Sequence, residues 1–473
     1  MTNKKQKNAN GRGKSNGPSH ASREGVYFLS IALENARCFG EKQTLDLSDG
    51  NGKPAQWTIL LGNNGTGKTT VLQAVASIAA ITTEKRLRVL SDRKRTAGED
   101  APFIPPPPAL VNFAKGEHGF FRFPDTDTTK LEASIAHGAG LAELAGQFQK
   151  NQIQCSIRPG LFISVETRIP NVPLPAIVCF GYGAARRMAD RSLPEDISDT
   201  GTETLLFYHA DLRNAEDWLL RADYAASKDS PQRKRQQERL EQVKQLLLAI
   251  LPEIDGIQFL TGSGVYPIPR VEFHTPYGWV PLRHLGYGYQ TVIAWMIDFA
   301  SRMIERYPAS SDPLAEPAVV LVDEIDLHLH PLWQRQLIGY LSRRFPNTQF
   351  IATAHSPLVV QAATKANLVL LRREGDRVVI DNTISALQGW RVDQVLTSDL
   401  FGLPSARPPH LDDLLQRRMA ILTKPHLTKK DERELAALEE QIGPLPGGET
   451  LEQAKRLALI EESLKLLQQA PKP

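Results

Sequence analysis

The chain has 473 residues, 41% of them hydrophobic and 23% charged, a composition that indicates a globular protein and excludes a fibrous or wholly disordered one. Its net charge of +3 is nearly balanced and gives no reason by itself to expect a nucleic-acid partner. The length predicts about three domains, although one elaborated α/β domain can account for most of it. The three cysteines lie far apart in the sequence, which argues against a disulfide framework and favours a reducing compartment. Because no apolar run reaches the length of a membrane span, we expect a cytoplasmic protein with no membrane partner.

Residues 1–25 are rich in Lys, Asn, Gly and Ser, and their few apolar side chains cannot offset the entropy of ordering, so a disordered basic tail is predicted. The apolar pattern that follows predicts a strand over 26–33 and a buried strand over 57–61. Apolar residues at helical spacing then predict a helix over 69–81. Residues 85–125 are basic and Pro-rich, which predicts a surface insertion.

The middle of the chain predicts alternating strands and helices, which is typical of the α/β class. Helical patterns fill an insertion at about 200–255, and a buried helix is predicted over 289–304. Residues 391–473 predict a helical C-terminal extension, with capping boxes that begin at Thr428 and Thr450. Short apolar segments predict the remaining strands, at residues 129–137, 152–158, 161–167, 176–180, 257–261, 270–274, 278–282, 318–322, 349–353, 368–371 and 378–380.

Residues 62–69, Gly-Asn-Asn-Gly-Thr-Gly-Lys-Thr, match the GxxxxGK[ST] pattern of a phosphate-binding loop. Glycine-rich turns present backbone N–H groups to phosphate without a Cβ in the way, and the dipole of the following helix adds to the attraction. In this pattern Lys68 neutralises the β and γ phosphates, and the Thr69 hydroxyl binds Mg²⁺. An ordinary glycine turn would leave Lys68 and Thr69 unexplained. The predicted nucleotide-binding residues of this segment are Gly62, Asn63, Asn64, Gly65, Thr66, Gly67, Lys68, Thr69 and Thr70.

A phosphate-binding loop requires a second carboxylate to hold Mg²⁺, and Asp323 supplies one directly after the apolar strand predicted at 318–322. Glu324, the next residue, is then placed to polarise an attacking water. The sequence therefore predicts one nucleotide site made from two segments that lie far apart in the chain.

A different interpretation treats residues 323–330 as a metal cluster. If this stretch were a strand, Asp326, His328 and His330 would recur at period two and share one face, as metal ligands must. The resulting metallohydrolase would leave Lys68 unexplained, so we favour the nucleotide site.

Four segments occur in the order that is found in ABC-type ATPases: the phosphate-binding loop, the Asp323-Glu324 pair, residues 329–331 (Leu-His-Pro) and residues 351–356 (Ile-Ala-Thr-Ala-His-Ser). Over roughly residues 26–390 the chain resembles the branch of this family that contains RecF, SMC and OLD-type proteins. The resemblance implies an α/β P-loop NTPase fold, namely an ABC-type two-lobed ATPase head with a helical insertion and a helical C-terminal extension. It also implies ATP and Mg²⁺ as cofactors, and a homodimer or higher homo-oligomer in which two heads enclose ATP.

The resemblance assigns roles to single residues by their position in the motifs. Lys68 and Glu324 would be catalytic, with Glu324 as the base, and His355 would be the switch histidine that senses the γ-phosphate. Asp326 would lie in the loop that crosses to the partner subunit. Arg37 resembles the residue that lies near the nucleotide in the first strands. For His355 the alternative is a capped strand end.

The signature segment departs from the family pattern. The family has Leu-Ser-x-Gly at the start of a helix that caps the γ-phosphate of the other subunit, whereas this chain has Leu285-Gly286-Tyr287-Gly288. Gly286 and Gly288 are the predicted nucleotide contacts, through backbone N–H groups and the helix dipole rather than a hydroxyl. The family's glutamine that completes the magnesium shell has no assigned residue here, and the strand leading to residues 182–187 is its best location by order.

The compact head and helical tail look most like the stand-alone ATPases that are encoded beside nucleases or other effectors in bacterial antiviral systems, such as the Septu-type ATPase. We therefore expect an ATP-binding and ATP-hydrolysing subunit that dimerises around ATP and regulates a separately encoded nuclease or effector. The alternative is a RecF-like clamp that acts directly on DNA in repair or recombination.

Overall fold

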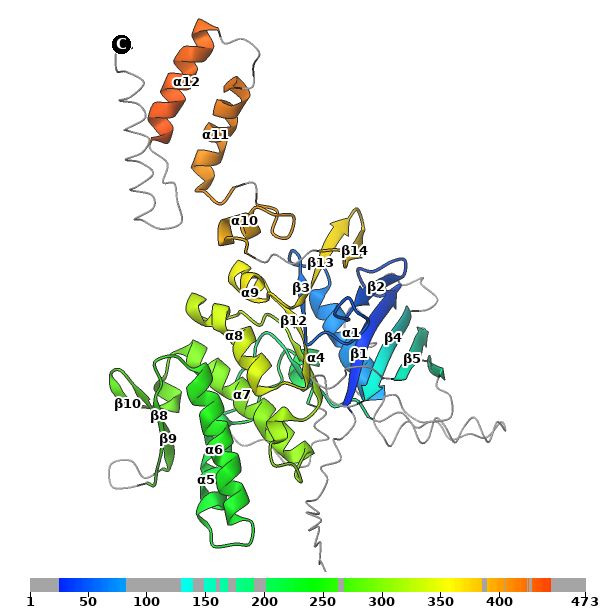
Figure 1. Cartoon of the computed structure of the whole chain (residues 1–473), viewed down its shortest axis with the longest axis vertical. Coiled ribbons are helices and arrows are strands. Elements are labelled where there is room, and N and C mark those ends of the chain that lie inside the picture. The colour runs from blue at the N-terminus through cyan, green and yellow to red at the C-terminus, as the bar shows by residue number, and fades with distance from the viewer. Residues whose placement is uncertain are drawn as a thin grey trace, which may run out of the picture. The chain divides into compact units, whose positions relative to one another are not determined.

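The computed structural model describes residues 25–81, 129–138, 149–158, 162–168, 176–190, 201–262, 268–384, 389–403, 405–422, 424 and 428–443. Of the tail predicted over residues 1–25, residues 1–24 lie outside the described residues, as do the insertion predicted over 85–125 and the helix start at Thr450. The prediction is wrong for Gly25, which begins a strand because its backbone pairs with that of Gly138. The chain divides into one unit that ends at Val392 and a second that begins at Asp393. Figure 1 shows the elements of both units, coloured along the chain.

A six-stranded sheet with the order β14-β13-β3-β12-β11-β7 forms the centre of the first unit as far as it is described (Figure 1). All of its neighbouring strands are parallel except β14, which runs antiparallel to β13. Strands β3, β11 and β12 are buried along their whole length, as expected for apolar runs covered on both faces. The bounds are β3 (Trp57–Leu61), β7 (Cys179–Tyr182), β11 (Ala318–Val322), β12 (Thr348–Thr353), β13 (Asn367–Glu374) and β14 (Arg377–Asp381).

The strand predicted at 176–180 is displaced toward the C-terminus. Strand β7 covers Cys179–Tyr182, because β11, its neighbour in the sheet, pairs with it only from Val319 to Val322. The shift carries the end of β7 to Tyr182, level with the end of β11.

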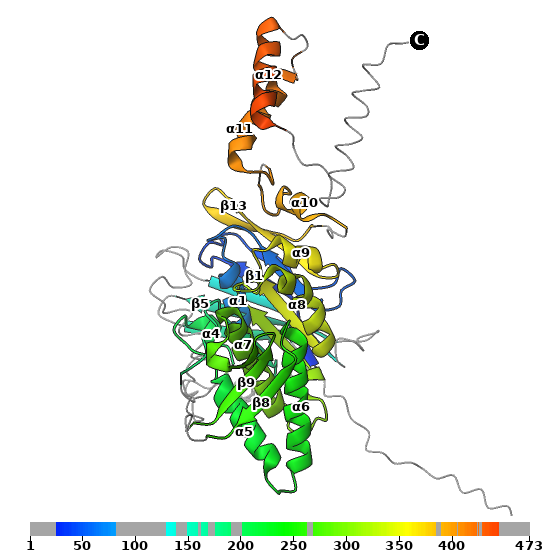
Figure 2. The ribbon, with the colours of Figure 1, turned by 90° about the vertical axis from the view of Figure 1, so that its left-hand side faces the viewer.

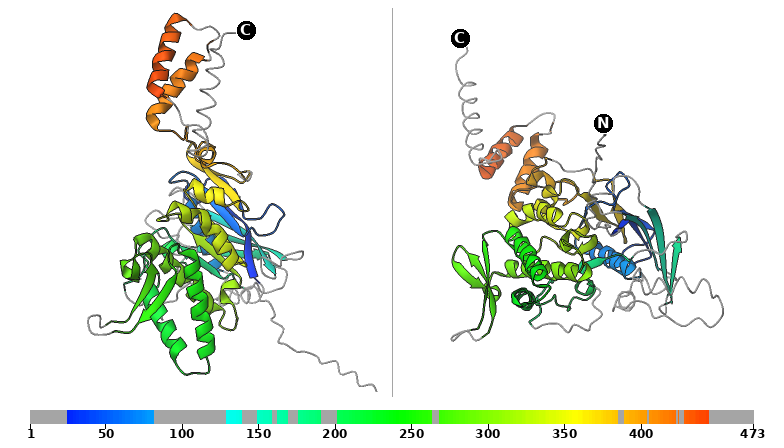
Figure 3. Two further views of the ribbon diagram at one scale, coloured as in Figure 1. Left: turned by 60° about the vertical axis from the view of Figure 1, so that its left-hand side comes forward. Right: turned by 60° about the horizontal axis from the view of Figure 1, so that its bottom comes forward.

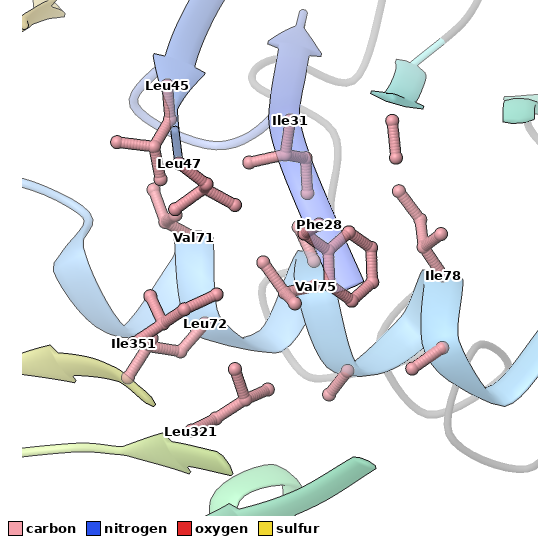
Figure 4. Packing of buried hydrophobic residues seen from close by; sticks show 14 of the residues in the cluster. Phe28, Ile31, Leu45, Leu47, Val71, Leu72, Val75, Ile78, Leu321 and Ile351 are labelled. Carbon is pink, nitrogen blue, oxygen red and sulfur yellow. The ribbon is translucent and has the colours of Figure 1, made fainter. Parts of the chain in front are cut away.

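Helix α1 (Lys68–Ile81) packs on the central sheet, and an antiparallel sheet with the order β2-β1-β4-β5-β6 packs on the opposite side of this helix. Figure 4 shows Val75 of α1 between Phe28 of β1 and Leu321 of the central sheet. Because α1 contacts apolar side chains from both layers, it is almost entirely buried, as its sequence of small and apolar residues requires. The bounds are β1 (Gly25–Glu34), β2 (Gln43–Asp46), β4 (Thr129–Gly138), β5 (Gln149–Arg158) and β6 (Phe162–Arg168).

One fully buried polar side chain joins the two layers. The amide of Gln349 in β12 accepts a hydrogen bond from Phe28 N and donates one to Phe28 O, each at 2.8 Å. This pair satisfies backbone groups of β1 that would otherwise be buried without partners, and so fixes β1 against the central sheet.

Helices cover the opposite face of the central sheet. Helix α5 and helix α6 form a hairpin that packs on α7 and beside the antiparallel sheet β10-β9-β8, as Figures 2 and 3 show in green. Helix α7 begins at Tyr287, two residues before the start predicted at residue 289, and most of its residues are buried. The bounds are α4 (Glu203–Leu206), α5 (Ala215–Ser227), α6 (Arg233–Ile250), β8 (Gly256–Leu260), β9 (Arg270–Thr275), β10 (Gly278–Pro281), η1 (Leu282–His284), α7 (Tyr287–Arg306), η2 (Pro313–Ala315), α8 (Pro331–Arg344) and α9 (Pro357–Ala362).

The second unit contains the hairpin of α11 (Pro409–Leu422) and α12 (Lys429–Ile442), after the short helix α10 (Val392–Leu396) at the boundary. The capping box predicted at Thr428 is confirmed: Asp431 N donates to Thr428 Oγ1 at 3.2 Å, and Thr428 N donates to Asp431 Oδ2 at 2.9 Å. Among the described residues, no helix is both long and apolar enough to span a bilayer.

Candidate nucleotide-binding site

The carboxyl ends of four parallel strands meet at one edge of the central sheet. Strand β3 leads into the glycine loop at Gly62, β11 into Asp323, and β12 into Ala354 and His355. Strand β7 leads into the segment that contains Arg186. Such an edge is where open α/β sheets bind ligands.

The glycine loop has a backbone that side chains would prevent. Gly62 has φ 137°, and a Cβ there would collide with the carbonyl oxygen of Leu371 in β13. Gly67 has φ 80°, and a Cβ there would collide with Cys38 Sγ. The loop can therefore take this path only with glycine at both positions.

The lysine of the loop lies beneath the exposed residues 63–65, which we call the crest of the loop. Lys68 is 7% exposed, and its Nζ donates to the carbonyl oxygens of Gly62 at 2.7 Å and Asn63 at 3.0 Å. Burial lowers the pKa of Lys68, and three nearby carboxylates, those of residues 323, 324 and 326, oppose that shift. The hydroxyl of Thr66 donates to Asn63 O at 2.8 Å and closes the loop. Because Asn63, Asn64 and Gly65 are exposed, the crest is open to an incoming phosphate.

The two halves of the predicted magnesium site touch. Thr69 Oγ1 donates to Asp323 Oδ2 at 2.7 Å across 254 residues of sequence, and Thr353 Oγ1 donates to Asp323 Oδ1 at 2.7 Å. The hydroxyl and the carboxylate are hard oxygen donors of the kind that Mg²⁺ prefers. Thr69 and Asp323 therefore fit the ion that the sequence predicts between them.

Glu324 follows Asp323 in a left-handed backbone conformation, with φ 50°. Its N–H donates to Thr353 Oγ1 at 2.7 Å, so the same hydroxyl orients both acidic residues. Within the described part of the chain, its carboxylate forms neither a hydrogen bond nor an ion pair. The side chain is thus free to accept a proton from water.

The turn after β11 is tied to the end of β12. Asp326 Oδ2 accepts a hydrogen bond from His355 N at 3.0 Å, and Gln334 Nε2 in α8 donates to Asp326 O at 3.3 Å. Ser356 Oγ donates to Gln334 Oε1 at 2.6 Å and accepts from Leu358 N at 3.1 Å. Ser356 therefore caps α9, which leaves the exposed imidazole of His355 without a capping role.

The metal-cluster interpretation of residues 323–330 is wrong for the structure described. The segment is a series of turns, in which the His328 ring lies against Tyr287 with centroids 4.8 Å apart. His330 Nδ1 instead accepts from Leu332 N at 3.3 Å and caps α8. No three His, Cys, Asp or Glu residues in the described ranges are grouped so that they could hold a metal ion.

The signature segment forms the start of α7. Gly286 is the N-cap residue, with φ −57°, and the nearest atom to a Cβ there would be Tyr289 Cδ2 at 3.8 Å. At Gly288 a Cβ would lie 2.5 Å from His328 O, so this glycine lets α7 pack closely on the turn after β11. No hydrogen bond among the described residues joins Gly286 or Gly288 to the glycine loop of the same chain.

Arg37 lies beside the first turns of α1. Its Nη1 donates to Thr70 Oγ1 at 3.3 Å and to Gln73 Oε1 at 2.9 Å, and its backbone has φ 48°. Burial lowers its pKa. The structure thus brings Arg37 and Thr70 together at the helix that follows the phosphate-binding loop.

Sequence reasoning did not single out three residues of this site: Thr353, Gln334 and Arg186. Thr353 carried a signal, because it ends a buried strand beside the His355 motif. Arg186 lies directly after the strand in which a glutamine was expected, and a basic residue in that glycine- and alanine-rich run was a usable sign. Gln334 gave no signal, because its role depends on how α8 folds back over the turn.

Comparisons with known proteins find a family and several relatives that are similar to parts of this chain. The model of a family described as "AAA domain, putative AbiEii toxin, Type IV TA system" matches residues 58–361. The Septu protein PtuA of Bacillus mycoides is 26% identical over 401 residues, which cover 84% of this chain and 48% of that protein. The "Retron Ec83 probable ATPase" of Escherichia coli is 34% identical over 163 residues, which cover 34% of this chain and 29% of that protein. The chain therefore spans about half the length, or less, of these relatives.

Among solved structures, the SMC head domain from Thermotoga maritima aligns with 76% of this chain and 100% of its own chain. The sequence identity is 14% and the TM-score is 0.39.

Proposed function

Because the chain belongs to the AAA-domain family whose model matches residues 58–361, and so has a P-loop ATPase fold, we propose that it binds and hydrolyses ATP with Mg²⁺. The observation that carries this proposal is the 2.7 Å hydrogen bond between Thr69 and Asp323, which joins the phosphate-binding loop to the acidic pair. The resemblance noted in the sequence and the relative named as a probable ATPase support the same activity.

Each residue has a distinct task in the proposed reaction. The loop N–H groups and Lys68 bind the phosphates, while Thr69 and Asp323 would hold Mg²⁺, which supplies charge neutralisation at the phosphate oxygens. Glu324 accepts a proton from the attacking water, because its carboxylate is free and follows directly on Asp323. Asp326 and the backbone of His355 keep this turn in place through their 3.0 Å hydrogen bond.

We also propose that two copies of the chain close around ATP. The crest of the phosphate-binding loop and the N-cap residue Gly286 are both exposed, and within one chain they share no hydrogen bond among the described residues. A second copy can present its Gly286, with the N-terminal dipole of α7, to the nucleotide bound by the first. His355 would then sense the γ-phosphate at the interface.

The biological role that we propose is antiviral defence. The named relatives include Septu protein PtuA and a retron ATPase, which supports a switch subunit that regulates a separately encoded nuclease or other effector. We place this function in the cytoplasm. Copurification with the products of neighbouring genes, followed by nuclease assays with and without ATP, tests the effector; binding to DNA by this chain alone would instead favour a RecF-like clamp.

Hydrolysis is tested by Glu324→Gln, with Lys68→Ala as the matched variant for binding. Glu324→Gln is expected to lower turnover by about 10² to 10⁴ with ATP affinity retained, since it removes only the base. Lys68→Ala is expected to lose affinity as well, because it removes a charge that contacts phosphate. Unchanged turnover in Glu324→Gln would refute the role of Glu324.

Sedimentation of Glu324→Gln should show a larger species with ATP than without it, and an identical profile would refute the dimer.

A further inference from the structure

Arg186 is a buried cation next to the turn after β11, residues 323–326, which we call the acidic turn. It follows β7 at the same sheet edge as the phosphate-binding loop, and its side chain and backbone together are only 2% exposed. Its backbone has φ 34°, in the left-handed region that non-glycine residues rarely adopt. Backbone strain of this kind persists where the surrounding structure fixes it, and it is concentrated at functional sites.

Among the described residues, the guanidinium of Arg186 makes one hydrogen bond, and that bond goes to the proposed base. Its Nη2 donates to the backbone carbonyl oxygen of Glu324 at 2.7 Å, and the guanidinium carbon lies 5.4 Å from the centroid of the Trp295 ring. The bond connects two residues with left-handed backbones, since Glu324 has φ 50°. Arg186 therefore holds the peptide that sets the direction of the Glu324 carboxylate.

The rest of this guanidinium lacks partners. In the part of the chain that is described, Nε and Nη1 of Arg186 are buried without a hydrogen bond, and so is Oδ1 of the neighbouring Asp326. Burial lowers the pKa of Arg186 to about 10, and the charge of Asp326 is the largest of the influences that oppose this shift, ahead of Asp323 and Glu324. A donor pair and an acceptor, each unsatisfied, thus lie in the same charged environment.

A space-filling role does not account for these features. Burying a guanidinium with unpaired N–H groups carries a desolvation penalty, and an apolar side chain of similar size would fill the same volume without that penalty. Arginine supplies two things that an apolar side chain cannot: a positive charge near three carboxylates, and a hydrogen-bond donor for Glu324 O. The strand that leads to this segment is the best location by order for the family's magnesium-shell glutamine, to which no residue of this chain is assigned.

We propose that Arg186 is a positioning residue for ATP hydrolysis, which orients Glu324 through its carbonyl oxygen and offers its unused N–H groups to Asp326 when the site closes. This inference rests on the proposed ATPase function. It adds a cation from the segment after β7 to the site, so that the acidic turn is held from the side of β7 as well as from β12.

The test compares Arg186→Met and Arg186→Gly with Arg187→Met. Arg187 is the matched control, because it is the next residue, is exposed and pairs with Asp211 instead. Arg186→Met is expected to lower kcat roughly 10²-fold with little change in KM, since misplacement of a base slows the chemical step rather than binding. Arg186→Gly suits the positive φ and leaves a space, so low millimolar guanidinium ion should restore part of its turnover but none of that of Glu324→Gln.

Turnover of Arg186→Met equal to that of Arg187→Met would overturn the inference while leaving the ATPase function intact. A loss of ATP affinity equal to the loss of kcat, or no response of Arg186→Gly to guanidinium, would also overturn it, because a structural role predicts both. If the wild-type protein hydrolyses no ATP, the proposed function fails and so does the role of Arg186 in hydrolysis, and amide hydrogen exchange of residues 323–329 without nucleotide then decides whether Arg186 holds the turn at all. Faster exchange in Arg186→Met than in Arg187→Met supports positioning, and equal exchange refutes it.

Discussion

The backbone N–H of His355 donates a hydrogen bond to Oδ2 of Asp326 across 3.0 Å, although 29 residues separate the two. The bond connects the end of β12 with the turn after β11, so the residue proposed to sense the γ-phosphate is fixed to the turn that carries the proposed base. The end of β12 and the turn after β11 are therefore held to each other by a direct contact.

Asp326→Ala is expected to lower turnover roughly 10²-fold, because a displacement of the acidic turn by about 1 Å is enough to misalign a catalytic group. The free energy of unfolding should fall by about 1 kcal/mol, the typical contribution of one hydrogen bond. Asp326→Asn is the control, since its amide oxygen can still accept from His355 N. Steady-state kinetics and urea unfolding measure both effects, and equal turnover in the two variants would contradict the positional role of this bond.

Thr353→Val should destabilise the protein by about 1–3 kcal/mol, because the fully buried hydroxyl serves both Glu324 N and Asp323 Oδ1 and valine satisfies neither. The same variant should need more Mg²⁺ for half-maximal turnover, by about 10- to 100-fold, since Asp323 loses the group that orients it. Thr353→Ser keeps the hydroxyl and is expected to behave like the wild-type protein. A magnesium titration in which the valine and serine variants coincide would show that Asp323 does not depend on Thr353.

Gly286→Ser restores the serine of the family signature at a position with room for it, because the nearest atom to a Cβ would be 3.8 Å away. A serine N-cap should stabilise α7 by a few tenths of a kcal/mol relative to glycine. We expect turnover to rise, since a hydroxyl is added to the group that faces the partner's nucleotide. Gly286→Ala, which fills the same space without a hydroxyl, should not share the gain, and a decrease in turnover in the serine variant would contradict the trans contact.

Gly288→Ala, two residues further on, should lower the stability of the protein, whereas Gly286→Ser should raise it. A Cβ there would lie 2.5 Å from His328 O, a backbone atom that moves only with the whole turn. Forcing this separation is expected to cost about 1–3 kcal/mol of stability, as overpacking usually does. Thermal unfolding compares this variant with Gly286→Ala, and a similar Tm for both would show that the contact with His328 is loose.

Much of the site could be predicted because many of its residues lie in short sequence motifs. The glycine loop predicts its own turn, and an apolar run before Asp323 predicts a buried strand whose end carries the acidic residues. Both follow from local sequence, and the structure brings Thr69 and Asp323 into contact. The roles of the site residues stay predictions until they are tested.

What the sequence could not indicate depends on tertiary packing. Arg186 reads as a surface cation beside Arg187, and only the position of β7 next to β11 buries one of the two and leaves the other in solvent. His328 and His330 alternate as strand residues would, yet Glu324 and His328 adopt left-handed backbones that end the strand at Val322. Period-two spacing therefore suggested a shared face that the turns abolish.

The order of strands in the central sheet also limits how early the nucleotide site can form while the chain is being synthesised. Strand β3 is made early, but its neighbours are β12 and β13, so Trp57 lies opposite Phe350 and Thr58 opposite Asn367. At the usual rates of translation, these partners leave the ribosome roughly 15 to 60 s after β3. Until then the nascent chain carries a complete phosphate-binding motif with no sheet to hold it, and an apolar strand in need of protection. A complete nucleotide site therefore cannot form before β12 and β13 have been made, and a chain that ends before residue 370 lacks part of the sheet that holds the phosphate-binding loop.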